Sequence, residues 1–224
     1  MLSTHTIDTS NTTRIVLVRH GETAWNAERR LQGHLDIALN AQGERQAQAL
    51  ANALAHESFD LVVSSDLQRA RQTAEALARV HAIAVQSDPC LRERCYGGFE
   101  GLLYSEIAER YPRQFAAWQA RDIDAALPPG ANPGETFRQF NERVTQAILG
   151  WASAHRGKAI ALVAHGGVLE CAYRAARGLA LDTPRDFKIP NASINRFAVT
   201  DGVLALESWG EVAHLRTAVL DELA

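Results

Sequence analysis

The chain has 224 residues, of which 46% are hydrophobic and 22% charged, and its formal net charge is −3. This length and composition are typical of one compact domain with a substantial core, and they exclude a fibrous or disordered protein. The 23 basic residues form no run that could follow a nucleic-acid backbone, and no segment has the roughly 20 apolar residues of a membrane span, so neither nucleic acid nor a membrane is an expected partner.

The first residues are polar and rich in Ser and Thr, and they lack the basic start and apolar run of a signal peptide. We expect a flexible N-terminal tail over residues 1–13, a single domain over residues 14–224, and a cytoplasmic location. The spacing of Cys90, Cys95 and Cys171 fits neither a disulfide framework nor a common zinc site. We therefore interpret them as small apolar residues and expect no metal.

The first predicted strand covers residues 14–18, which are apolar and β-branched, as in a strand buried on both faces. It leads directly into Arg19, His20 and Gly21, so this motif lies at a strand's carboxyl end. Because Gly21 has no side chain, we expect it to let a bulky anion approach the His20 imidazole closely. After a polar loop, a helix is predicted over residues 39–55 by apolar residues at helical spacing, which are Ala47, Leu50, Ala51 and Leu54.

A second buried strand is predicted at residues 61–63, and Ser65 and Gln68 after it have the spacing of a capping box, which predicts the start of a helix. Arg69 falls in the first turn of this helix and off its apolar stripe. A cation there faces the positive end of the helix macrodipole, at a cost of about 0.3–1 kcal/mol, which a nearby anion would reverse. The predicted stripe consists of Leu67, Ala70, Ala74 and Leu77.

Residues 83–86 are predicted to form a short strand, and residues 91–101 an irregular, glycine-rich passage. Residues 102–134 mix aromatic, charged and proline residues without a clean period, which indicates a helical excursion over the edge of the sheet that serves as a lid or specificity wall. Within it, three aromatic side chains form either a wall of the site or ordinary packing. These are Tyr104, Phe115 and Trp118.

A long amphipathic helix is predicted over residues 136–155, and residues 159–164 form another fully apolar strand, which ends in His165 and two glycines. Two final strands are predicted at residues 195–200 and 203–209, separated by an Asp-Gly turn. The alternation of strands and helices predicts an α/β fold with a mostly parallel sheet. Ligands of such sheets bind outside the carboxyl ends of the strands, where both histidine motifs fall.

A histidine beside a glycine is most often structural, so His20 alone says little. Its neighbours change the interpretation, because Arg19 can match phosphate oxygens, Asn26 adds a neutral donor, and the backbone N–H groups after His165 add further donors at a helix start. Glu93 lies in the irregular passage, where it is either a general acid facing the same pocket or a solvated loop charge.

Five segments in order resemble the motifs of the histidine phosphatase superfamily, in particular its phosphoglycerate mutase-like branch. They are RHGETAWNAERRLQGHLDIALNAQGERQA, SSDLQRARQTA, LRERCYGGFEG, PGET with the helix that follows, and AHGG. The resemblance covers nearly the whole chain after the tail. It implies a three-layer α/β/α sandwich with a mostly parallel, mixed sheet.

The resemblance also implies that His20 becomes phosphorylated on an imidazole nitrogen and that Glu93 donates a proton to the departing oxygen. The residues implied to hold the phosphoryl group are Arg19, Asn26, Arg69 and His165, and those implied to contact substrate are Thr23, Gln32, Gly33, Arg94, Tyr96 and Gly166. We expect a double displacement without metal or cofactor, in which two arginines and a protonated His165 neutralise the charge that magnesium neutralises elsewhere.

The fate of the phosphoenzyme is open between hydrolysis and transfer. Residues 93–97 resemble the mutase version of the third motif, whereas residues 99–101 are common among the phosphatases. Residue 104 is tyrosine where the glycolytic mutases carry lysine, and no paired arginines follow it. We therefore predict a phosphohydrolase acting on a small phosphorylated metabolite, a phosphate monoester. The alternatives are a mutase that interconverts 2- and 3-phosphoglycerate and a non-catalytic phospho-ligand-binding module. Oligomeric state is open, with a homodimer as one alternative.

Overall fold

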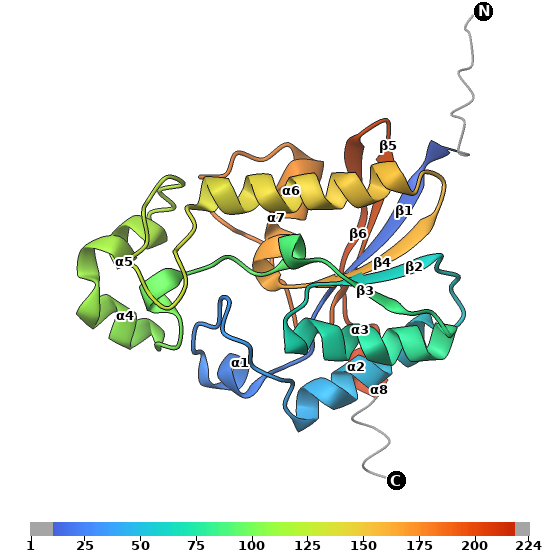
Figure 1. Cartoon of the computed structure of the whole chain (residues 1–224), viewed down its shortest axis with the longest axis horizontal. Coiled ribbons are helices and arrows are strands. Elements are labelled where there is room, and N and C mark those ends of the chain that lie inside the picture. Colours follow the sequence, from blue (N-terminus) through green and yellow to red (C-terminus); the bar gives the residue numbers. More distant parts are fainter. Residues whose placement is uncertain (1–10, 218–224) are drawn as a thin grey trace, which may run out of the picture.

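A computed structural model describes residues 11–217, and its centre is one six-stranded sheet (Figure 1). Its strand order is β3-β2-β4-β1-β5-β6. The strands are β1 (Thr13–Arg19), β2 (Leu61–Ser64), β3 (Val85–Ser87), β4 (Ala159–Ala164), β5 (Ile194–Thr200) and β6 (Val203–Glu211). The strands β3, β2, β4 and β1 run parallel to one another, whereas β5 pairs antiparallel with both β1 and β6. The sheet is therefore mixed and mostly parallel, as predicted.

Helices cover both faces of the sheet, which gives the predicted three-layer α/β/α sandwich (Figure 1). One face carries α2 (Ala41–Leu54) and α3 (Gln68–His81), with α8 (Ala213–Thr217) beside α2. The other carries α6 (Phe137–Ala154) and α7 (Gly166–Arg177). Successive strand residues point to opposite faces, so in β1 Val16 and Val18 pack with α2 and α3, while Ile15 and Leu17 pack with α6 and α7.

The expected excursion over residues 102–134 contains α4 (Tyr104–Arg110) and α5 (Pro112–Gln119), followed by irregular chain. It lies to one side of the sandwich, next to the short α1 (Ala24–Glu28) (Figure 1). Single 3-10 turns at Pro89–Leu91 and Gly97–Phe99 lead into it. The excursion has a small core of its own, formed by Leu31, Phe99, Ile107 and Leu127. It can therefore stand as a wall beside the sheet's edge.

The N-terminal boundary of the fold differs from the prediction. Thr13 belongs to β1 and is only 1% exposed, while Asn11 and Thr12 form hydrogen bonds with Asp201 and Thr200. The tail predicted over residues 1–13 thus cannot include the last three. Residues 1–10, like residues 218–224, lie outside the described residues.

The predicted capping box of α3 is wrong. The helix begins after Leu67, which provides no side-chain cap, because Ser65 and Gln68 are engaged elsewhere. The Ser65 hydroxyl lies 2.8 Å from Nε2 of His165, and the Gln68 backbone and side-chain N–H groups donate to Asp36. Other boundaries shifted little, although β3 begins two residues later than expected because the Ile83 N–H still bonds to the end of α3.

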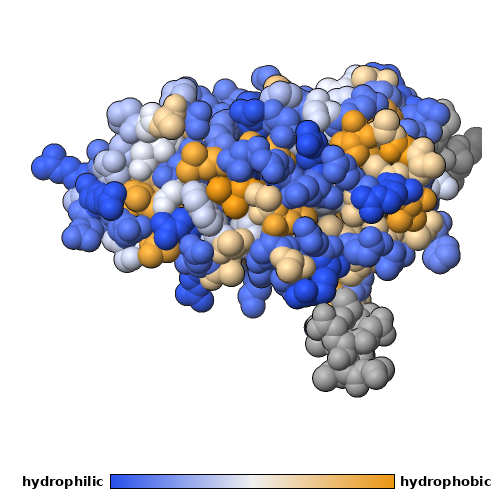
Figure 2. All heavy atoms as spheres, turned by 60° about the horizontal axis from the view of Figure 1, so that its bottom comes forward, coloured by the Kyte–Doolittle hydropathy of each residue, from blue (hydrophilic) through white to orange (hydrophobic). Residues whose placement is uncertain are grey.

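The surface shown in Figure 2 intersperses hydrophobic residues with hydrophilic ones. The large hydrophobic side chains most exposed in the described residues are Val80, Tyr104, Leu179 and Val203, which lie on separate elements or loops. Between residues 11 and 217, no helix has the length and apolar character needed to cross a bilayer.

Candidate active site

Two neighbouring strands bring the two motif histidines together. β1 and β4 are parallel and in register, with Arg19 opposite Ala164, so His20 and His165 follow the same edge of the sheet. The His20 N–H donates to the Ala164 carbonyl at 2.9 Å, and the two imidazole centroids are 5.1 Å apart. Both side chains are buried, at 3% and 0% exposure. The pairing predicted from the sheet's carboxyl edge is therefore present.

The imidazole of His20 has a defined tautomer. Its Nδ1 lies 2.6 Å from the Gly21 carbonyl oxygen, which only accepts hydrogen bonds, so Nδ1 carries the proton and Nε2 keeps a free lone pair. Burial, reinforced by Arg69 and Arg19, holds the pKa of His20 well below its usual 6.5. The residue is thus a neutral imidazole with Nε2 available as a nucleophile.

Two arginines, Arg69 buried and Arg19 half-buried, surround this nucleophile without an ion-pair partner among the described residues. Arg69 is 1% exposed and donates from Nη1 and Nη2 to the carbonyls of Leu35 and Gly33, at 2.9 and 2.8 Å. Arg19 donates from Nη1 to the Ile189 carbonyl at 2.5 Å. The Nε atom of each arginine is buried and has no hydrogen-bond partner, and neither arginine forms an ion pair within residues 11–217.

Burial lowers the pKa of Arg69 to about 10 and also lowers the pKa of Arg19, yet both remain cations at neutral pH. Buried, uncompensated charge is costly, and an anion placed between the two guanidinium groups would offset that cost. The arrangement therefore fits a phosphoryl group, whose oxygens match guanidinium geometry.

His165 supplies another unpaired nitrogen. Its Nε2 lies 2.8 Å from the Ser65 hydroxyl, whereas its Nδ1 is buried and has no partner. Burial, then the nearby Arg69 and His20, hold the pKa of His165 well below 6.5. The protein by itself thus keeps this ring neutral. The protonated His165 that we expected requires the negative charge of a bound phosphoryl group to hold the additional proton.

A carboxylate from the irregular passage after Leu91 faces the start of the helix that follows His165. Glu93 accepts hydrogen bonds from the backbone N–H groups of Arg94 and Gly167, at 2.8 and 3.0 Å. A Cβ on Gly167 would overlap Oε1 of Glu93, so only glycine allows the start of α7 to approach it this closely. Gly167 is a functional residue that we did not predict, although the paired glycines after His165 were a signal for it.

Gly21 has a different role from the one predicted. A Cβ at this position would lie 2.5 Å from the Gly43 carbonyl oxygen, so the missing side chain lets the start of α2 pack against the first motif. The Gly21 N–H also donates to the Thr73 hydroxyl at 3.0 Å. The glycine is thus required by backbone packing, and the expected role in admitting an anion is wrong.

His20, the two arginines and Glu93 line a cavity of about 460 Å³, whereas His165 is fully buried behind His20 and does not reach its wall. The predicted residues on its wall are Arg19, His20, Asn26, Gln32, Gly33, Arg69, Glu93, Tyr96 and Gly166. Thr23 is fully buried and does not line the cavity, but its N–H and hydroxyl both donate to Oδ1 of Asn26, at 3.2 Å each. Arg94 does not line this cavity either and instead lines the neighbouring cavity described next. We call this space the phosphoryl cavity.

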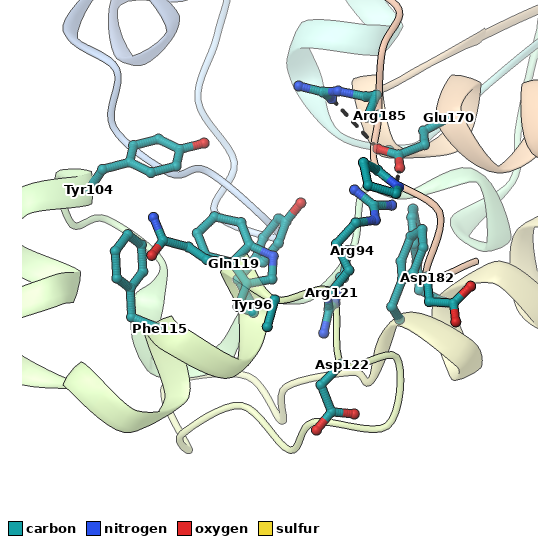
Figure 3. A pocket seen from close by; sticks show the side chains of 16 residues that line it. Arg94, Tyr96, Tyr104, Phe115, Gln119, Arg121, Asp122, Glu170, Asp182 and Arg185 are labelled. Atoms are coloured by element: carbon teal, nitrogen blue, oxygen red, sulfur yellow. Dashed lines mark hydrogen bonds and ion pairs between the residues drawn. The ribbon is translucent and has the colours of Figure 1, made fainter. Parts of the chain in front are cut away.

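A second cavity of about 510 Å³ adjoins it and is shown in Figure 3. We call it the outer cavity. The two share Tyr96, Tyr104, Gly167, Glu170 and Arg185 on their walls. Three predicted aromatic residues line the outer cavity, with Tyr104 stacked on Trp118 at 5.7 Å between ring centroids and Phe115 beside them. The excursion thus builds a wall of this site.

Three charged residues of the outer cavity pair with one another, Arg121 and Arg185 each with Glu170. Glu170 on α7 accepts from Arg121 at 2.5 Å and from Arg174 at 3.0 Å, and Arg185 lies 3.6 Å from its other oxygen (Figure 3). Arg94 differs, because its guanidinium packs against the rings of Tyr96 and Phe137 and forms no ion pair with any described residue. The pairs of Glu170 with Arg121 and Arg185 join separate segments, and we did not predict them from the sequence.

Comparison with known proteins places this geometry in a family. Residues 15–212 match the sequence model of the histidine phosphatase superfamily (branch 1). The chain belongs to this superfamily. It is 41% identical over 204 residues to phosphoglycerate mutase-like protein 4 of Arabidopsis thaliana, covering 90% of this chain and 86% of the relative. It is 38% identical over 209 residues to a metal-independent phosphoserine phosphatase of the same plant, covering 92% and 84%.

A solved structure, YhfR of Bacillus stearothermophilus, is similar with a TM-score of 0.83 at 31% identity, covering 91% of this chain and 99% of that one. Phosphatases and phosphoglycerate mutase-like proteins both occur among these relatives. The protein is therefore an enzyme of the phosphoglycerate mutase-like type, with phosphatase function.

Proposed function

We propose that this enzyme hydrolyses a small phosphate monoester through a phosphohistidine formed on His20. One observation carries the proposal: His20, with its Nε2 free, lines a cavity together with Arg19 and Arg69, and the buried Nε atoms of these arginines and the buried Nδ1 of the adjacent His165 have no partner among the described residues. A neutral nucleophile beside uncompensated cations suits attack on an anionic phosphorus centre better than it suits a structural role.

In the first step, the Nε2 lone pair of His20 attacks phosphorus in line with the leaving oxygen. The N–P bond forms as the P–O bond to the alcohol breaks, and Glu93 gives its proton to the departing oxygen. Arg19 and Arg69 stay in place and neutralise charge on the equatorial oxygens, while the negative phosphoryl group favours a proton on His165.

In the second step, water attacks the phosphohistidine. Glu93 takes a proton from that water, the N–P bond breaks, and inorganic phosphate leaves with His20 neutral again. The backbone N–H groups of Arg94 and Gly167 hold the Glu93 carboxylate in one position for both steps. The preorganised arginines carry out the charge neutralisation, so the proposed mechanism needs no metal ion or cofactor.

The alcohol part of the substrate would occupy the outer cavity, since this cavity opens directly from the phosphoryl cavity past Tyr96 and Tyr104. There, Arg94 is a cation without a carboxylate partner among the described residues, and the aromatic wall offers apolar contacts. A small phosphorylated metabolite is the proposed substrate class.

The unpaired Arg94 also favours a second candidate, because a phospho-acid could place its carboxylate there and be rephosphorylated at another oxygen. That reaction is a phosphoglycerate mutase activity. We rank it below hydrolysis, because the other cations of the outer cavity, Arg121 and Arg185, are already paired with Glu170 and leave fewer partners for a second acidic group. A non-catalytic phospho-ligand-binding module is the third candidate, and the free Nε2 of His20 argues against it.

The test is a panel of phosphate monoesters incubated with purified protein and EDTA, in which released phosphate and 2-/3-phosphoglycerate interconversion are measured in parallel. We expect phosphate release that EDTA does not diminish. Efficient interconversion with little release would establish the mutase reaction instead. If the protein binds phosphate esters but shows neither turnover nor acid-labile phosphate on the protein, the binding module is established.

The proposed setting is the cytoplasm, supported by Cys90, Cys95 and Cys171, which are all free thiols, as is usual in a reducing compartment. Fractionation of the producing cells tests this. Homodimer formation remains a prediction, and light scattering of the purified protein tests it.

A further inference from the structure

The loop after α7 returns across the phosphoryl cavity before β5 begins. The Ile189 carbonyl accepts a hydrogen bond from Arg19, and the Ala192 N–H donates to the Arg19 carbonyl at 3.0 Å and to the His20 carbonyl at 3.2 Å. Between these two contacts lies Asn191, whose side chain turns inward. This segment is thus fixed to the first motif by both backbone and side chains.

Asn191 offers one amide nitrogen to three oxygens of that motif. Its Nδ2 lies 3.0 Å from the His20 carbonyl, 3.3 Å from the Gly21 carbonyl and 3.2 Å from Oδ1 of Asn26. All three oxygens can only accept, so the identity of the Asn191 nitrogen as a donor is set by its surroundings. Its two hydrogens are therefore shared among the nucleophile's backbone and the Asn26 side chain.

The contact determines which end of the Asn26 amide faces the phosphoryl cavity. Oδ1 of Asn26 accepts from the Thr23 N–H and from the Asn191 amide, and it lies 3.2 Å from the Thr23 hydroxyl, whose single hydrogen is shared with Oε1 of Gln32 at 3.0 Å. With Oδ1 held on this inner side, Nδ2 is left as a donor for the cavity that Asn26 lines. If the Asn26 amide were rotated, its NH₂ group would face the N–H donors of Thr23 and Asn191, and its oxygen would point at the bound anion.

We propose that Asn191 is a positioning residue for phosphoryl transfer, which fixes the Asn26 amide with its NH₂ group toward the phosphoryl group. The same side chain steadies the Gly21 carbonyl, which also accepts from Nδ1 of His20 at 2.6 Å and so sets the tautomer of the nucleophile. Asn191 does not touch the reacting atoms. It acts on the reaction through Asn26 and through the backbone that carries His20.

The inference rests on the proposed function, and an isosteric substitution that replaces the amide donor by a charged acceptor tests it most sharply. In Asn191→Asp, an acceptor-only carboxylate would face three acceptor oxygens, and the Asn26 amide would rotate to donate to it. Oδ1 of Asn26 would then point at the anion. In Asn191→Ala, the Asn191 donor to Oδ1 is lost, but Thr23 still holds the amide. The isosteric variant should therefore be more harmful than the truncation.

We expect Asn191→Asp to lower kcat/KM for p-nitrophenyl phosphate about 100-fold and Asn191→Ala about 10-fold. The affinity for inorganic phosphate, measured by calorimetry, should fall in the same order. Asn52→Asp is the matched control, since Asn52 lies on the exposed side of α2 and bonds only to Gln48. It should stay within about twofold of wild type in both measurements.

A residue that served packing alone would give the opposite ranking, with the isosteric Asp tolerated better than Ala, and this result would overturn the proposal. Retention of wild-type phosphate affinity in Asn191→Asp would do the same. Should this variant fail to fold, as judged by near-UV circular dichroism, Asn191→Ala with its expected 10-fold loss decides the question.

A double-mutant cycle tests whether the effect passes through Asn26. In an Asn26→Ala background, Asn191→Asp should cost less than about fivefold, because the amide that it would rotate is gone. An undiminished 100-fold loss there would refute the role assigned to Asn26. Because phosphate binding is measured without turnover, absence of ester hydrolysis in wild type would reject the proposed function and leave this inference testable.

Discussion

The two adjoining cavities of this enzyme differ in how their charges are balanced. In the phosphoryl cavity, Arg69 and the Nε atom of Arg19 are buried, and neither arginine forms an ion pair within the described residues. In the outer cavity, Arg121 is paired with Glu170, and Arg185, which lies with Glu170 on the wall that the two cavities share, pairs with the same carboxylate. The phosphoryl cavity thus requires an anion from a ligand, whereas Arg121 and Arg185 in the outer cavity already have a carboxylate partner within the protein.

The difference follows from where the residues come from. The phosphoryl cavity is assembled at the carboxyl ends of β1 and β4 and at the start of α3, which are fixed by the sheet and its hydrogen bonds. The outer cavity is built by the excursion, α7 and the loop after it. The phosphoryl group, which all substrates share, would bind at the rigid edge of the sheet, and the alcohol part, which varies, would contact the excursion and the loop after α7.

The largest expected effect concerns the nucleophile of the phosphoryl cavity. His20→Ala should lower kcat by about 10⁴-fold or more, because the covalent route is lost, while inorganic phosphate still binds to the remaining arginines. Acid-labile phosphate on the protein, followed by mass spectrometry with a phosphate-ester donor, should disappear as well.

His56→Ala is the matched control, since His56 lies far from both cavities, at the opposite end of the strands beside Glu57 and Arg196. It should retain full turnover. Substantial activity in His20→Ala would remove His20 from its assigned role.

An identical substitution made in each cavity tests the contrast between them. Arg69→Lys should lower kcat/KM by about 10²–10³-fold for every phosphate monoester, because lysine cannot keep the bonds to Leu35 and Gly33 while presenting a donor to the phosphoryl group. Arg121→Lys should cost about tenfold or less and vary with the ester, because its charge serves the pairing with Glu170. Equal losses across all esters in both variants would contradict the distinction.

The smallest expected effect is a pH dependence of stability that comes from the phosphoryl cavity. The pKa values of His20 and His165 lie well below 6.5 in the native state, so below about pH 6.5 the unfolded chain binds protons that the native chain does not. Their stabilising contribution is therefore complete above pH 6.5 and is lost as pH falls, by about 1.4 kcal/mol per pH unit for each ring.

Urea unfolding between pH 7.5 and 5.5 measures this loss. Saturating phosphate should reduce the slope, because the bound anion favours protonated His165. A stability that does not change over this range would show that the two imidazoles are not kept neutral by burial.

The sheet, its flanking helices and the phosphoryl cavity could be predicted from the sequence, because continuous apolar strands and the residues directly after them are local signals. The residues that orient the site were harder. Ser65 appeared as a helix cap, yet its hydroxyl bonds to His165, a hundred residues away. Gly21 appeared as an opening for a ligand, yet it accommodates the Gly43 backbone. Side chains that can satisfy either a local or a distant partner give no sequence signal for that choice.

Small elements escaped prediction for a related reason. The five-residue α1 buries none of its own residues and is held by the Thr23 cap and by hydrogen bonds to Asn26, so no apolar periodicity marks it. Asn191 lies 165 positions from the amide that it orients. Only the folded backbone makes such a pair visible.

The two halves of the loop between α7 and β5 have different roles. Its final residues, around Asn191, are tied to the motif that carries the nucleophile, whereas Arg185 a few residues earlier faces the outer cavity. Insertions or exchanges near residues 182–186 should accordingly change substrate choice while the chemical step survives, whereas the same edits around Asn191 should slow the reaction of every ester. A laboratory seeking new specificities should randomise the first half of this loop and leave its second half untouched.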